Sequence, residues 1–207
     1  MKKAAIINFG GGNLFSVTQA CKAAEIDPII TQNPAELDDA DLLLLPGVGA
    51  FKNAMTFLKD RKLDEAIIKN TNKGKPLVGV CLGMQIMATY SEEFGKTSGL
   101  NLIPGQVRYF KGVVEPGAKI PHTGWNTISG ARKDSLMQQA VGNDFYFIHS
   151  LFVETDNPDH TIAHCTYHNI NFAAAIAHEN ITGFQFHPER SGKNGLSLYK
   201  NLIEQMA

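Results

Sequence analysis

A cysteine between two closely spaced glycines, in the run Gly79-Val-Cys81-Leu-Gly83, is the feature that most constrains how this chain folds. The apolar run Leu77–Val80 has the length and β-branched content of a buried strand, and the residues after Gly83 suit a helix. A Gly-x-Cys-x-Gly turn between a strand and a helix is the cysteine form of the nucleophile elbow. The glycines are needed because the turn is sharp and both neighbouring backbones pass close to it.

The elbow should present the Cys81 side chain at the carboxyl end of its strand, beside a helix N-terminus. The partial positive charge of that N-terminus favours a thiolate over a thiol. The alternative is an inert buried cysteine, because free cysteine is among the most buried residue types. A base within reach of the sulfur would decide between the two interpretations.

A histidine followed two residues later by an acid supplies the candidate base. The run Ile181–Phe186 alternates as a strand does and stops at His187-Pro188-Glu189. Proline disfavours the α region for the residue before it, so His187 is predicted to be extended, where residues two apart face the same way. A carboxylate beside the imidazole holds one tautomer and stabilises the imidazolium. Cys81, His187 and Glu189 would then act as nucleophile, base and orienter. A capping or core histidine and a solvated loop acid are the alternatives.

Attack on an amide also requires donors for the oxyanion that forms. The backbone N–H of Leu82, directly after the nucleophile, is one candidate. The second is the amide of Val48 or Gly49, in the glycine loop Leu45–Ala50 that follows a strand-like run. A plain strand-to-helix turn is the alternative interpretation of this loop.

Three motifs together resemble the class I, triad-type glutamine amidotransferases: Gly79-Val-Cys81-Leu-Gly83-Met-Gln85, Phe186-His187-Pro-Glu189 and Pro46-Gly-Val-Gly49. Three further segments are similar to those of the glutaminase subunits of imidazole glycerol phosphate synthase: Asn8-Phe-Gly-Gly-Gly-Asn13, Pro121-His122-Thr-Gly-Trp125-Asn126 and Tyr146-Phe-Ile-His149-Ser150. The resemblance covers essentially the whole chain. The combination is highly specific, whereas each piece alone is moderate.

The resemblance implies a role for each matching position. It makes Cys81 the nucleophile, His187 the base and Glu189 the orienter. It implies that Gln85 and Glu93 contact the glutamine, with Glu93 near the α-ammonium group. The remaining implied positions are the backbone around His149 and Ser150 in the same pocket, Gly49 beside the oxyanion, and Asn13, His122 and Trp125 toward the partner subunit.

The resemblance also implies an activity and a partner. L-Glutamine is hydrolysed to glutamate through a cysteine thioester, without a cofactor or a metal ion, and the ammonia passes to a cyclase subunit that makes imidazole glycerol phosphate in histidine biosynthesis. At 207 residues the chain has no room for a cyclase barrel, which takes about 250 residues. A separate cyclase subunit, forming a heterodimer with this chain, is therefore expected.

Three other functions stay open at this point. Asn8 and Thr123 depart from residues frequent in that subfamily, so the same glutaminase could serve a different ammonia-using synthase. A non-catalytic binding subunit that keeps the fold is the second alternative, and the intact triad residues disfavour it. A cysteine peptidase on a related fold is weaker, because Gln85 and Glu93 would then be unexplained.

Composition excludes several other classes. With 43% apolar and 19% charged residues the chain is an ordinary globular protein, expected to form one domain over residues 1–207. A net charge of −1 argues against nucleic acid or an anionic membrane as partner, and no apolar run is long enough to span a bilayer. Three widely spaced cysteines fit a reducing cytoplasm. His164-Cys165-x-x-His168 lacks a second ligand cluster, so no metal site is expected there.

The pattern of elements predicts an α/β fold: a mainly parallel central sheet between two layers of helices, with a small additional antiparallel sheet. The expected strands are 4–9, 28–31, 41–45, 77–80, 106–110, 125–128, 145–153, 161–167, 172–178 and 183–186, and the expected helices are 14–24, 50–59, 63–72, 84–90 and 194–205. Ligands in open α/β sheets bind at the carboxyl ends of the strands. Cys81, the loop 46–49 and His187 all follow strands, as that rule requires.

Overall fold

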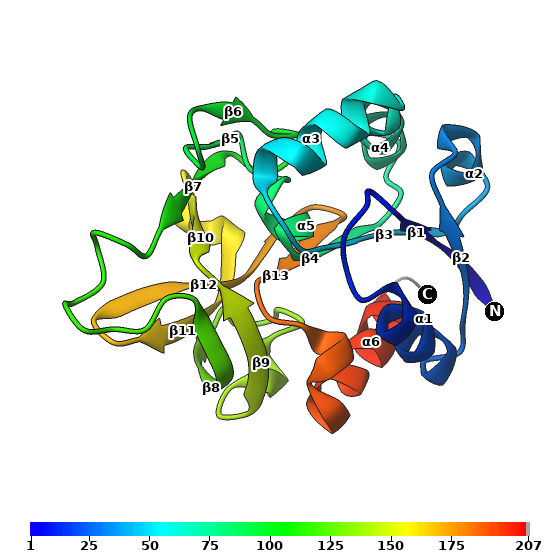
Figure 1. Ribbon diagram of the computed structural model, residues 1–207. Coiled ribbons are helices and arrows are strands. Elements are labelled where there is room, and N and C mark those ends of the chain that lie inside the picture. Colours follow the sequence, from blue (N-terminus) through cyan, green and yellow to red (C-terminus); the bar gives the residue numbers. More distant parts are fainter. Residues whose placement is uncertain (206–207) are drawn as a thin grey trace.

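A nine-stranded sheet runs through the molecule, with helices on both of its faces (Figure 1). The computed structural model describes residues 1–205. The strand order is β2-β1-β3-β4-β13-β12-β11-β8-β9. The bounds are β1 Lys2–Ile7, β2 Ile26–Thr31, β3 Leu42–Gly47, β4 Leu77–Cys81, β8 His122–Ala131, β9 Asp144–His149, β11 Thr161–Tyr167, β12 Ile170–His178 and β13 Ile181–Phe184.

The half of the sheet from β2 to β13 is parallel. Parallel neighbours need crossover connections, and in the first part of the chain helices supply them. These helices are α1 Leu14–Ala23, α2 Pro34–Asp38, α3 Phe51–Asp60 and α4 Leu63–Thr71, and α6 Gly192–Gln205 closes the described chain. The α/β class predicted from the sequence is confirmed. Asn33 caps α2 and Pro34 is its first residue, a position at which the N–H that proline lacks would have no partner within the helix.

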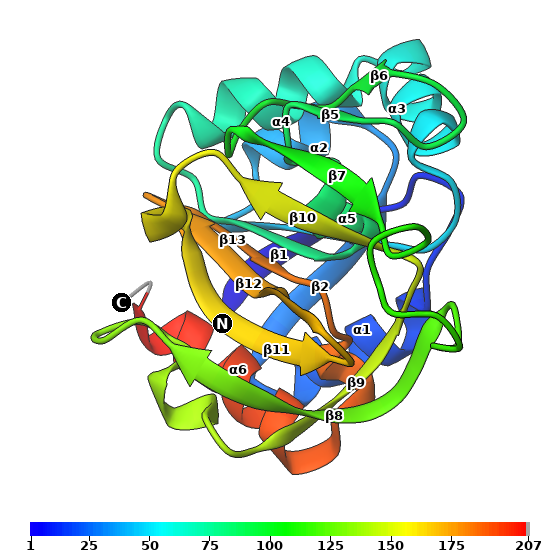
Figure 2. The same cartoon turned by 90° about the vertical axis from the view of Figure 1, so that its left-hand side faces the viewer.

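The other half of the large sheet, from β13 to β9, is antiparallel. A second sheet, in the order β10-β7-β5-β6, lies on the same side of the large sheet as α3 and α4 (Figure 2). Its strands are β5 Tyr90–Ser91, β6 Thr97–Ser98, β7 Gly105–Tyr109 and β10 Leu151–Thr155. It is mixed rather than purely antiparallel, because β5 and β7 run parallel.

The core consists of two apolar layers, one on each face of the large sheet. Successive residues of a strand point to opposite faces, so Ala4 and Ile6 pack toward α1 and α6 while Ala5 and Ile7 pack toward α3 and α4. Both layers are built from residues with almost no exposed surface. No helix within residues 1–205 has the length and apolar character that crossing a membrane would take.

The prediction of a helix over residues 84–90 is wrong in its bounds. Helix α5 is only Leu82–Gln85, although the apolar residues that follow are fully buried. The carbonyl groups of Ile86 and Ala88 accept hydrogen bonds from the backbone of residues 100 and 101 instead of continuing the helix. Tertiary hydrogen bonds therefore replace the helical ones.

The strand predicted over residues 145–153 is two strands. Strand β9 ends at His149 and pairs with β8 in the large sheet, whereas β10 begins at Leu151 and pairs with β7 in the small sheet. Ser150 lies at the crossing point between the sheets. The chain therefore changes sheet at residues that the sequence associated with the substrate pocket.

The elbow depends on very close backbone approach. A Cβ atom on Gly83 would lie 1.6 Å from the carbonyl oxygen of Leu45 on β3, and one on Gly79 would lie 2.7 Å from the Gly83 backbone. Such contacts with backbone atoms cannot be relieved by rotating a side chain. The two glycines therefore allow α5 to start directly over the ends of β3 and β4.

Replacing Gly83 with alanine should destabilise the protein by at least about 1–3 kcal/mol, the usual cost of overpacking a core. The cause is the clash with the Leu45 carbonyl. Urea denaturation measures the change in free energy of unfolding. Gly130→Ala on β8 is the matched control, because nothing lies within 4 Å of its Cβ position. Equal stability of the two variants would contradict the close approach.

Candidate active site

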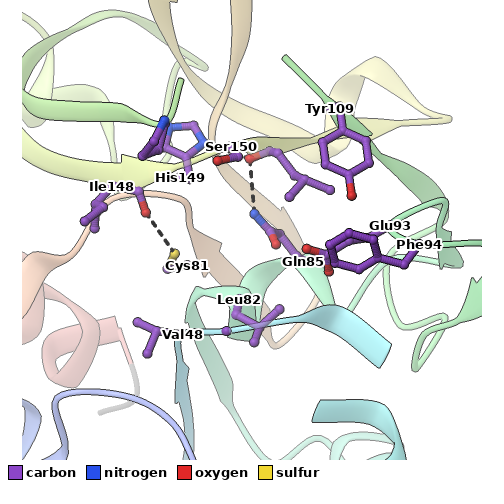
Figure 3. Close-up of a pocket in the computed structure, with 13 residues that line it drawn as sticks. Val48, Cys81, Leu82, Gln85, Glu93, Phe94, Tyr109, Ile148, His149 and Ser150 are labelled. Carbon is purple, nitrogen blue, oxygen red and sulfur yellow. Dashed lines mark hydrogen bonds between the residues drawn. The ribbon is translucent and has the colours of Figure 1, made fainter. Parts of the chain in front are cut away.

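A cavity of about 420 Å³ opens where β3 and β4 end, beneath the crossing from β9 to β10 (Figure 3). This volume is within the usual range for small-molecule sites. Cys81 lies at one end of the cavity and Glu93 at the other. The lining residues are Val48, Gly49, Cys81, Leu82, Gln85, Glu93, Phe94, Tyr109, Pro121, Ile148, His149, Ser150 and Leu151.

Cys81 has a strained backbone and a nearly buried side chain. Its φ of 54° and ψ of −109° put a non-glycine residue in a sparsely populated region, which typically costs about 1–3 kcal/mol. The sulfur lies 3.8 Å from the carbonyl oxygen of Ile148, to which the thiol donates (Figure 3), and it accepts from the side-chain amide of Gln185 at 3.7 Å. The strain exists because the chain turns from β4 into α5 at this residue.

His187 and Glu189 form a buried ion pair, with 2.8 Å between Nδ1 and the carboxylate. Both side chains are at most 5% exposed. His187 is extended, as predicted, but Pro188 begins a short 3-10 helix, Pro188–Arg190, that turns Glu189 back toward the ring. The contact therefore comes from a turn rather than from two residues sharing one face of a strand.

The other ring nitrogen, Nε2, is the one available to Cys81. Within residues 1–205 it is buried and has no hydrogen-bond partner. Burial lowers the pKa of His187, but interactions with Cys81 and then Glu189 outweigh it and raise the pKa from 6.5 to about 10. The base and the predicted nucleophile therefore influence each other electrostatically, and the raised pKa of the ring favours transfer of the thiol proton from Cys81 to His187.

The backbone of His187 is fixed by its neighbours. The N–H of His187 donates to the carbonyl of Tyr146, and the Ser191 hydroxyl donates to the carbonyl of His187 at 2.6 Å. The same hydroxyl accepts from the N–H of Tyr146 at 3.0 Å. Strand β9 and Ser191, the residue just before α6, thus hold the backbone that carries the imidazole.

The two remaining cysteines have no comparable surroundings. Cys21 and Cys165 are buried, and burial raises the pKa of each thiol to about 12. Their thiols stay protonated at neutral pH and are poor nucleophiles. Of the three cysteines only Cys81 lines the large cavity.

The residues predicted to supply the oxyanion donors line the same cavity as Cys81. Leu82 is the first residue of α5, so its N–H has no partner within the helix. The carbonyl of Val48 faces Gly11, where a Cβ would lie only 2.3 Å from its oxygen. Because the C=O and N–H of a trans peptide point in opposite directions, the N–H of Gly49 points away from Gly11. The Gly10–Gly12 loop thus packs against the loop that carries this candidate donor.

Glu93 places a carboxylate at the far end of the cavity. It accepts a hydrogen bond from the N–H of Phe51, at the start of α3, at 2.6 Å, and it is only 9% exposed. Burial and then the charge of Glu93 raise the pKa of Tyr109. The helix N-terminus stabilises the negative charge that a cationic ligand group would need.

Gln85 is close to the cavity, but its amide nitrogen is already engaged. It donates to the carbonyl of Leu151 and to the side-chain oxygen of Gln185, both at 3.1 Å. A ligand can therefore use only the oxygen of this amide without breaking a hydrogen bond. Ser150 lines the same cavity through its position between the two sheets.

The ring of His149 is structural rather than acid–base. It contacts the Leu151 carbonyl through Nδ1 at 2.7 Å and His122 through Nε2 at 3.0 Å. Burial lowers the pKa of His149 to about 3 and that of His122 to about 4, so both rings are neutral. His122 is 3% exposed, so its side chain lies in the interior and not on a partner-facing surface.

The other two residues predicted to face a partner are exposed. The side chain of Asn13 caps α1 by accepting from Ser16 N–H, and Trp125 is 58% exposed on β8. Exposed apolar side chains also surround the mouth of the cavity, among them Val48, Phe94 and Ile148. Exposed apolar side chains that gather into a large patch mark interaction surfaces, and these three all line one cavity.

Sequence reasoning missed Gln185, Tyr109 and Phe94. Gln185 carries a detectable signal, because it is a polar residue in an apolar strand-like run, two positions before His187. Tyr109 and Phe94 come from the small sheet and its loop, whose placement over the cavity has no local signal. Within residues 1–205 no group of three or more metal-ligating side chains is present.

Known proteins are similar to this chain in sequence and in fold. Residues 5–206 match the family model for class-I glutamine amidotransferases. The HisH subunit of imidazole glycerol phosphate synthase from Synechococcus elongatus is 42% identical over 98% of this chain and 93% of its own length. The HisH subunit from Methanothermobacter thermautotrophicus is 41% identical over 97% of each chain. The structure of PurLQS from Thermotoga maritima superposes with a TM-score of 0.75 over 100% of both chains at 16% identity, a likeness of fold alone.

The raised pKa of His187 predicts a measurable pH dependence. Because the pKa is 6.5 when unfolded and about 10 when folded, the contribution of this group to stability is complete below about pH 6.5 and is lost as the pH rises through about 10. Nuclear magnetic resonance of the labelled ring should show a midpoint well above 6.5, and Glu189→Gln should lower it. A midpoint at or below 6.5 in the wild-type protein would rule out the charged pair.

Proposed function

Because the chain belongs to the class-I glutamine amidotransferases, and within them to the HisH subunits of imidazole glycerol phosphate synthase, we propose that L-glutamine is hydrolysed in the cavity beside Cys81. The family resemblance found in the sequence is confirmed, and with it the glutaminase activity that supplies ammonia for histidine biosynthesis. One observation carries the assignment of the site. A buried His187–Glu189 pair interacts with the sulfur of a strained cysteine, in a cavity with a carboxylate at its other end.

The two ends of the cavity orient the substrate. The α-ammonium group of glutamine pairs with Glu93, whose charge is held by the N-terminus of α3. The side-chain amide then extends toward Cys81, between the wall formed by Ile148–Leu151 and the loop at Val48. A free α-amino group is thus required at one end and a carboxamide at the other.

The first half of the reaction forms a thioester. The Cys81 thiol proton passes to His187, and the sulfur attacks the amide carbon of glutamine. The N–H groups of Leu82 and Gly49 stabilise the oxyanion. His187 then protonates the departing nitrogen, so that ammonia leaves and the glutamyl group stays on sulfur.

The second half regenerates the enzyme. His187, now neutral, takes a proton from water, and the resulting hydroxide attacks the thioester carbon. The carbon–sulfur bond breaks, glutamate leaves, and the proton returns to the sulfur. Throughout both halves Glu189 holds Nδ1 in its protonated tautomer and stabilises the positive ring.

A cyclase subunit covers the mouth of the cavity and receives the ammonia. The exposed side chains of Val48, Ile148 and Trp125 supply an apolar surface for it, and Asn13 lies on an exposed loop. Ammonia made in a covered cavity reaches the partner without mixing with bulk water. The assembly is a heterodimer in which this chain makes the ammonia and the partner uses it.

Replacing Cys81 with alanine should abolish glutamine-dependent synthesis by the complex with a cyclase subunit, by at least about 10³-fold, because no nucleophile remains. Synthesis from added ammonium salt should be unchanged, because that route bypasses the cavity. Assays of the purified complex with each nitrogen source make the comparison. Loss of both activities would contradict this division of labour.

Replacing Glu93 with glutamine should raise the KM for glutamine about tenfold or more, because a charge-assisted contact with the α-ammonium is lost. Glutaminase kinetics of the complex measure it. Glu92→Gln is the matched control, because Glu92 is the exposed neighbour outside the cavity. If Glu93→Gln lowers kcat but leaves KM unchanged, Glu93 does not bind the substrate.

A further inference from the structure

Gln185 is a fully buried polar residue that touches the reacting sulfur and has no part in the mechanism above. It lies one residue beyond the end of β13, with its backbone N–H bonded to the carbonyl of Ala174 on β12. Its side-chain nitrogen is 3.7 Å from the sulfur of Cys81. An uncharged amide is costly to bury in this way unless its hydrogen bonds are satisfied.

The neighbours of Gln185 determine which end of its amide faces the sulfur. The Leu151 carbonyl can only accept, so the atom of Gln85 beside it must be the donating nitrogen. That nitrogen also donates to Gln185, so the atom of Gln185 that faces it must be the oxygen. The nitrogen of Gln185 is therefore left to face Cys81.

The same Leu151 carbonyl anchors a second chain of hydrogen bonds. His149 donates to it through Nδ1, which leaves Nε2 of His149 to accept from His122. Both lone pairs of the carbonyl are thus occupied, one by Gln85 and one by His149. The nitrogen of the Gln85 amide must therefore face the Leu151 carbonyl, and the oxygen of the Gln185 amide must face that nitrogen.

Two polar groups act on the sulfur in opposite directions. The Ile148 carbonyl accepts from the thiol and favours the protonated form. An N–H group from Gln185 favours the thiolate, because a hydrogen bond to an ionised acceptor is roughly twice as strong as a neutral one. The balance between them affects how readily the proton moves from sulfur to His187.

We propose that Gln185 is a positioning residue that stabilises the Cys81 thiolate, oriented by the relay from Leu151 through Gln85. The proposal rests on the proposed function of Cys81 as nucleophile. When the thiol proton passes to Nε2 of His187, the negative charge left on sulfur is met by the Gln185 N–H on one side and the imidazolium on the other. The attacking electron pair stays aimed into the cavity.

The test is the pH profile of alkylation of Cys81 by iodoacetamide, with the modified residue identified by mass spectrometry. Gln185→Met keeps the length of the side chain but removes the donor. Its profile should shift upward by about one pH unit or more, the worth of one hydrogen bond to a charged sulfur. Gln185→Glu replaces the donor with a negative charge and should shift the profile further in the same direction.

Two more variants complete the design. Gln85→Met leaves Gln185 in place but unoriented, and should give a smaller upward shift. Gln106→Met is the matched control, because its amide bonds Tyr90 and Glu154 on the small sheet and does not reach the sulfur. Its profile should coincide with that of the wild-type protein.

The outcomes distinguish failure of the role of Gln185 from failure of the role of Cys81. If the profiles of Gln185→Met, Gln185→Glu and the wild-type protein coincide, the role of Gln185 is refuted while that of Cys81 stands. If wild-type Cys81 does not react at any pH at which the protein is folded, the proposed function itself fails. Should Gln185→Met not fold, the profile of Gln85→Met is compared with that of the wild-type protein. An upward shift supports the role of Gln185, and coincidence of the two profiles refutes it.

Discussion

The contact between the backbone of Gly83 and the carbonyl of Leu45 is the constraint on which the rest of the site depends. It allows α5 to begin over the ends of β3 and β4 without any loop between strand and helix. Cys81 must then adopt a positive φ, and its side chain can only point into the cavity. The strain at that residue is sustained because the parallel sheet on both sides of β4 fixes the strand.

The charged side chains of the site are each balanced by a neighbouring group. A histidine and a glutamate that are almost fully buried would be expensive apart, and each is present because the other balances its charge. The neutral rings of His149 and His122 lie behind them, so no second charge competes with His187 for the thiol proton. The carboxylate of Glu93 is held separately, at a helix N-terminus at the far end of the cavity.

How far the sequence alone could predict this structure depends on how local each feature is. The elbow at Cys81, the extended His187 before proline and the alternation of strands and helices are written in neighbouring residues, and the structure has them. The early end of α5 could not be foreseen, because residues 100 and 101, which donate to the carbonyl groups of the residues just beyond it, are distant in sequence. The interior position of His122 likewise depends on packing between β8 and β9.

The substrate end of the site could be predicted only in part from the sequence. Glu93 was identified only through family resemblance, since nothing in its own segment predicts a contact with the N-terminus of α3. The change of sheet at Ser150, which forms one wall of the cavity, was hidden within a single apolar run. Gln185 could have been found from its spacing to His187, but only once that histidine was assigned a role.

The most direct test of this mechanism is covalent labelling with a glutamine-analogue electrophile, followed by peptide mapping, in the wild-type protein and in His187→Ala. If Cys81 is the nucleophile and His187 its base, the reagent should modify Cys81 and leave Cys21 and Cys165 untouched, and labelling should be much slower in the variant. Labelling that spreads over all three cysteines, or that proceeds equally well without the imidazole, would contradict it.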